Sequence, residues 1–124
     1  MRPRARDERG LSESTQWAVL FSLLMLLTLG IIQAGILMHG RNVAQRAATA
    51  AVDSARGSFG SVTDAQQVAQ GIAQSGGLQG VTIRISRGAT TVTADVAGSA
   101  PAILDLVGQI HESATAPLER VSQP

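Results

Sequence analysis

Apolar residues dominate one long stretch near the start of the chain, residues 17–38, which reads WAVLFSLLMLLTLGIIQAGILM. Only Ser22, Thr28 and Gln33 interrupt this stretch with a polar side chain, and residues 14–40 carry no formal charge when histidine is counted as neutral. A helix rises about 1.5 Å per residue, so about twenty apolar residues match a hydrocarbon layer about 30 Å thick. The pattern therefore predicts a helix that spans a membrane.

The energetics of insertion support this prediction. The stretch holds about a dozen Leu, Ile, Val and Phe residues, and at about −0.3 to −0.6 kcal/mol each they contribute roughly −4 to −7 kcal/mol. The first alternative is the buried core helix of a soluble protein, but such helices are usually shorter and keep a polar stripe. The second is a cleaved secretory signal, whose apolar core has only about 7–15 residues.

Helical spacing continues beyond the apolar stretch. No proline occurs between His39 and Arg56, alanine is abundant there, and small apolar residues recur every three or four positions. We therefore expect one continuous helix from Trp17 to Arg56, about 60 Å long, which Gly57 and Gly60 end. Before it, residues 1–10 are expected to form a charged, disordered leader. Candidate helix caps follow this leader at Ser12, Ser14 and Thr15.

A second helix is predicted over residues 62–74. Thr63 or Asp64 lies near its expected start, and Gly76 and Gly77 follow its expected end. Apolar side chains recur within it at spacings of three and four, as expected for one buried face. These residues are Val62, Ala65, Val68, Ala69 and Ile72.

Alternating apolar and polar residues then predict strands. In residues 81–86 the side chains of Val81, Ile83 and Ile85 face one way, and residues 91–96 alternate in the same manner after a turn at residues 87–89. Residues 101–110 suit a short helix, and residues 112–118 suit a last strand with Ala114, Ala116 and Leu118 on one face. The expected fold class is therefore α+β and membrane-anchored, with a long helix, a short helix and an antiparallel sheet of about three strands.

The arginines around the apolar stretch predict its orientation. Arg2, Arg4, Arg6 and Arg9 precede it, whereas Arg41 and Arg46 follow it, and the side richer in arginine and lysine usually stays in the cytoplasm. The expected parts are a charged cytoplasmic leader (1–13), a transmembrane helix (14–40), an extracytoplasmic extension of that helix (41–57) and a small extracytoplasmic αβ domain (58–124).

Composition removes most chemical functions. A formal net charge of +1 is too small to indicate binding of nucleic acid. The absence of cysteine excludes thiolate catalysis and thiolate metal sites. The two histidines, His39 and His111, lie far apart in sequence, and no phosphate-binding loop or nucleophile motif occurs. We therefore expect no catalytic residue, cofactor, metal or small-molecule substrate.

Three residues of the apolar stretch suggest a surface for helix packing. Gly30 and Ala34 lie one turn apart and would let a second helix approach closely. Gln33 lies beside them and needs a hydrogen-bond partner in lipid. Trp17 falls at the expected cytoplasmic boundary, where amphipathic rings anchor membrane helices.

Several stretches, taken in this order, resemble the TadE-like family of pseudopilins from tight-adherence (Tad) pilus systems. These are ERG before the helix, QWAVL at its start, residues 30–35, HGRNVAQRAATAAVDSARG after them, and SATAPLERV near the end. The resemblance implies a single-pass inner-membrane protein with a pilin-like long helix and a small exported domain. Its expected partners are membrane lipid and other pilin-like or Tad assembly subunits.

The resemblance also implies cleavage by a prepilin peptidase after Gly10, which would leave Leu11 as the first residue. Prepilin-type sequences usually have a glutamate fifth after the cut, whereas the fifth residue here is Thr15. This departure favours a minor or accessory pseudopilin over a subunit of the filament shaft. The alternatives are an anchored envelope protein or binding module unrelated to pili, and a soluble protein released by signal cleavage.

Overall fold

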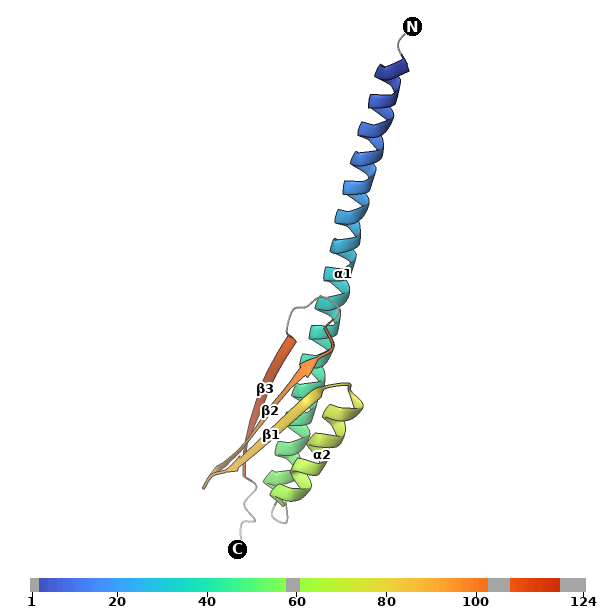
Figure 1. The fold of residues 1–124 in the computed structure, drawn as a ribbon. Coiled ribbons are helices and arrows are strands. Elements are labelled where there is room, and N and C mark those ends of the chain that lie inside the picture. The colour runs from blue at the N-terminus through green and yellow to red at the C-terminus, as the bar shows by residue number, and fades with distance from the viewer. Residues whose placement is uncertain (1–2, 58–60, 103–107, 119–124) are drawn as a thin grey trace, which may run out of the picture.

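The structure, a computed structural model, describes residues 3–57, 61–102 and 108–118, and their order is two helices followed by three strands. Helix α1 (Pro3–Arg56) is far longer than the rest of the fold and projects beyond it (Figure 1). Helix α2 is Val62–Ser75, and the strands are β1 (Gln79–Arg87), β2 (Thr91–Ala100) and β3 (Gly108–Pro117). The predicted α+β class is confirmed.

Helix α1 begins earlier than the sequence suggested. The leader was expected to be disordered, but the helix already starts at Pro3, a residue type that suits a first helical position because its fixed backbone angle matches the helix. The Thr15 hydroxyl donates to the carbonyl oxygen of Leu11 at 2.8 Å, within the helix, so it is not a cap. The expected end at Arg56 is confirmed.

Helix α2 has nearly the predicted bounds, but its cap is Ser61. The Ser61 hydroxyl accepts a hydrogen bond from the backbone N–H of Asp64 at 3.2 Å. Gly76 caps the other end, and Gly77 has a φ of +88°, which glycine adopts without strain. The residues buried on this helix are Ala65, Ala69 and Ala73, whereas Val62 and Val68 of the predicted face are exposed.

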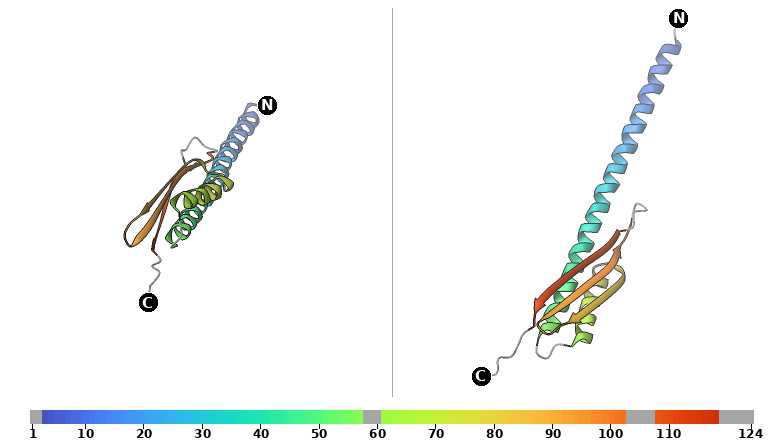
Figure 2. Two further views of the ribbon diagram at one scale, coloured as in Figure 1. Left: turned by 90° about the horizontal axis from the view of Figure 1, so that it is seen from below. Right: turned by 90° about the vertical axis from the view of Figure 1, so that its left-hand side faces the viewer.

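The three strands form one antiparallel sheet in the order β1–β2–β3. Its inner face carries the predicted apolar positions of β1 and β2, and Val92, Ala94 and Val96 are fully buried there. Figure 2 shows the sheet as one layer and α1 with α2 as the other. β2 and β3 lie against α1, and β1 contacts α2.

Strand β3 begins at Gly108, where a helix over residues 101–110 was expected. That expectation is wrong for residues 101–102, which are not helical, and for residues 108–110, and its middle, residues 103–107, lies outside the described residues. The physical reason is pairing: Ala100 is opposite Gly108 and Gly98 is opposite Ile110, and Ile110 is buried with only 3 % of its surface exposed. Tertiary contacts thus override the local helical spacing.

Candidate membrane-embedded surface

Helix α1 has an exposed apolar half and a packed half. From Leu11 to Ile32 its large apolar side chains are exposed, except the half-buried Leu29, whereas from Val43 to Ala55 one face is buried beneath α2 and the sheet. Among the described residues one helix, Arg9–Arg56, is long and apolar enough to cross a membrane, and only 6 % of its most apolar window is buried. A core helix of a soluble protein would be mostly buried.

Two hydroxyl groups in the apolar part of the exposed half are satisfied within the helix. The hydroxyls of Ser22 and Thr28 donate to the carbonyl oxygens of Ala18 and Leu24, both at 2.8 Å. An unsatisfied polar group costs several kcal/mol in hydrocarbon, about as much as several apolar residues contribute. The exposed half of α1 can therefore enter lipid without leaving these hydroxyls unpaired.

Gln33 lies where the exposed half meets the folded domain. It is 3 % exposed, and its side-chain Nε2 donates to the carbonyl oxygen of Pro101 at 3.5 Å, a long contact. The partner that the amide needs thus comes, at least in part, from the same chain. The sequence could not reveal this contact because the two residues are 68 positions apart.

Gly30, which is half-buried, and Ala34 lie to one side of that contact. At 3.6 residues per turn they lie about 60° and 100° around α1 from Gln33. Ala34 is exposed, and no atom of the described residues lies within 4 Å of a Cβ placed on Gly30. Within the described structure, these two residues leave a surface that another helix can reach.

The remaining predicted positions lie near the start of α1. Trp17 is 71 % exposed and Leu11 is 68 % exposed. Gly10 is also exposed and belongs to the same helix, so the bond between Gly10 and Leu11 has helical geometry. Both residues are exposed among the residues that the structure describes.

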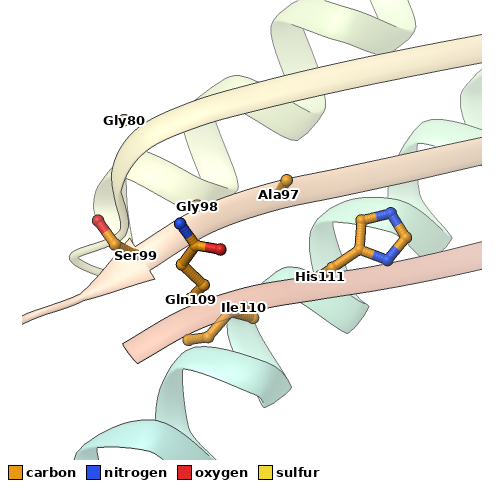
Figure 3. A pocket seen from close by; sticks show the side chains of 7 residues that line it. All are labelled: Gly80, Ala97, Gly98, Ser99, Gln109, Ile110 and His111. Atoms are coloured by element: carbon orange, nitrogen blue, oxygen red, sulfur yellow. The ribbon is translucent and has the colours of Figure 1, made fainter. Parts of the chain in front are cut away.

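A shallow hollow on the outer face of the sheet is a second feature (Figure 3). Ala97 and Gly98 leave space on β2, and Gln109 and His111 of β3 border it. Beside it, His111 Nε2 lies 3.8 Å from Asp95 Oδ1. The described residues contain no group of three histidine, cysteine or acidic side chains that could hold a metal. Sequence reasoning missed the hollow because strand register brings its residues together.

Comparison with known proteins links the chain to one family. The model of the TadE-like protein family matches residues 13–53, about a third of the chain. This segment covers nearly all of the exposed half of α1 and nearly all of its packed half. The match confirms the resemblance inferred from the sequence. No curated protein and no solved structure matches the chain.

Proposed function

We propose, from the match of residues 13–53 to the TadE-like protein family, that this chain is a minor or accessory pseudopilin of a Tad-type pilus. One structural observation carries the proposal further. A single helix joins an apolar half without cover to a half that is built into a small αβ domain. That division suits a subunit held in the membrane that presents its domain outside. The chain acts by association, and no reaction is assigned to it.

The proposed location is the inner membrane, crossed once, with the N-terminus in the cytoplasm. The arginine bias around the apolar stretch supports this orientation. The leader (1–13), the transmembrane helix (14–40), its extension (41–57) and the αβ domain (58–124) remain the proposed parts. Trp17 would anchor the helix near the cytoplasmic boundary.

The proposed partners are other pilin-like or Tad assembly subunits, which would pack against α1 around Gly30, Gln33 and Ala34. Small residues let two helix backbones approach closely in lipid. Because Gln33 already contacts Pro101, Gly30 and Ala34 supply the open part of this face. Close backbone approach is the interaction that a bulky side chain at Gly30 would block.

Replacing Gly30 tests this function. Gly30→Leu should reduce co-purification of pilin-like subunits from detergent-solubilised membranes severalfold, because the side chain holds the partner helix away. Gly35→Leu is the matched control: neither glycine has a described atom within 4 Å of an added Cβ, and the two lie about 140° apart around α1. Equal recovery of partners with both variants would contradict the proposed packing of a partner helix against Gly30. Failure of the unaltered chain to recover any pilin-like subunit would favour an anchored protein unrelated to pili.

We also propose cleavage between Gly10 and Leu11, which the family resemblance implies. The mass of the chain purified from membranes of its own cell should then correspond to a first residue at Leu11. A mass that begins at Met1 would contradict processing and leave a plain membrane anchor. A first residue beyond Met38 would indicate secretion.

A further inference from the structure

We propose that one end of the αβ domain rests in the headgroup layer of the membrane that α1 crosses. This end, the proximal tip, consists of residues 79–80, 98–102 and 109–110, where β1 begins, β2 ends and β3 begins. The inference rests on the proposed membrane anchorage and adds a second contact with lipid. The occupant of this surface is the phospholipid headgroup region of the outer leaflet.

Two contacts fix the tip beside the middle of α1. The Pro101 carbonyl oxygen accepts the hydrogen bond from Gln33. About two helical turns further along, Gly40 is buried. A Cβ placed on Gly40 would meet the Ile110 side chain, and side-chain atoms of Ala100 and Leu78 would lie 3.4 and 3.5 Å from it. The tip therefore lies alongside residues 33–40 of α1. The strands end near the middle of the helix in Figure 1, in agreement with these contacts.

The positions of charged residues then set the height of the tip. Glu13 is the last charged residue before the apolar stretch and Arg41 the first after it. A hydrocarbon layer about 30 Å thick takes about twenty residues of helix. If both charges stay outside it, a span of that length within residues 14–40 ends between about residue 33 and residue 40. The outer edge of the hydrocarbon thus falls beside the tip.

The chemistry of the tip suits that depth. The described residues of the tip include no acidic residue, lysine, arginine or histidine, and the sequence between Ala102 and Gly108 contains one acidic residue, Asp105. Gln79, Pro101, Ala102 and Gln109 are exposed, and amides exchange hydrogen bonds with headgroups and interfacial water. At the same height Met38 is 65 % exposed about 140° around α1 from Gln33, so lipid would also cover the far side of the helix.

The absence of cysteine from the sequence makes this inference directly testable. Single-cysteine variants of the full chain would carry an environment-sensitive fluorophore in vesicles of phosphatidylcholine and phosphatidylglycerol. Gln109→Cys and Ala102→Cys report on the tip. Leu24→Cys, on the exposed half of α1, reports on the span. Ser86→Cys, exposed near the opposite end of the sheet, is the matched control.

Quenching separates the outcomes. Nitroxide on the lipid headgroups should quench both tip labels severalfold more than the Ser86 label, and aqueous iodide should show the reverse order. A second quencher carries its nitroxide deep in the lipid acyl chains. If it does not quench the Leu24 label, the membrane anchorage itself is contradicted. With Leu24 quenched, tip labels that behave like the Ser86 label would overturn the inference and leave the anchorage intact. Tip labels shielded from both quenchers would also overturn it, because a protein then covers the tip.

Discussion

At the scale of single residues, Gly76 shows how closely the two helices approach. It ends α2 with ordinary right-handed backbone angles, φ −81° and ψ 0°, so its conformation does not require glycine. Its surroundings do, because an added Cβ would overlap the Val43 side chain, at 2.6 Å from Cγ2 and 2.9 Å from Cβ. The sequence marked Gly76 correctly as a helix stop and gave no sign of this contact with α1.

Gly76→Ala should therefore lower the free energy of unfolding by about 1–3 kcal/mol, as overpacking of a core usually does. Val43 is branched at Cβ and belongs to α1, so it has little freedom to move aside. The control is Gly71→Ala in α2, where an added Cβ meets nothing within 4 Å. It should stabilise the helix by up to about 1 kcal/mol. Chemical denaturation in detergent micelles, followed by circular dichroism, measures both, and equal effects would contradict the packing.

At the scale of elements, the contact between α1 and α2 depends on alanine. All three buried residues of α2, Ala65, Ala69 and Ala73, are alanines spaced four apart, and α1 contributes a run of buried alanines to the same core. Such small side chains bring helix axes close together, which gives a dense core with few large residues. The face predicted from the sequence contained Ala65 and Ala69 but also both valines of α2, which are exposed, because apolar spacing alone does not reveal how close the neighbouring helix lies.

Ala69→Leu should destabilise the domain by about 1–3 kcal/mol, because a fully buried position between helices has no room for three more carbons. Val68→Leu is the comparison. Val68 is 43 % exposed, and a surface change of this kind usually stays within about 0.5 kcal/mol. Denaturation midpoints of the two variants in the same micelles provide the measurement, and a larger loss at Val68 would reverse the assigned face.

At the scale of the whole molecule, the sequence predicted both helices and the three strands in their order, but it also placed a short helix before the last strand and began α1 too late. Hydrophobic length and strand alternation are local patterns, so the apolar helix, α2 and the faces of β1 and β2 could be inferred directly. The start of β3, the Gln33–Pro101 contact and the hollow beside Gly98 depend on pairing between distant segments. The position of the proximal tip beside residues 33–40 of α1 likewise depends on contacts between distant segments.

The central claim is that lipid surrounds the exposed half of α1, and a double substitution tests its energetics. Leu24 and Leu27 are each about 60 % exposed there. Replacing both with arginine should make the free energy of membrane insertion less favourable by roughly 6–8 kcal/mol, which is enough to offset the contribution of the whole apolar stretch. Asn42→Arg with Thr49→Arg, at exposed positions of α1 in the proposed extension, is the matched control.

Extraction of cell membranes with alkaline carbonate is the most direct measurement. The unaltered chain and the control should remain in the membrane pellet until detergent is added. The variant with Leu24→Arg and Leu27→Arg should be recovered largely in the supernatant. An unaltered chain that stays in the carbonate supernatant, with a mass showing that residues 11–38 are still attached, would contradict the account.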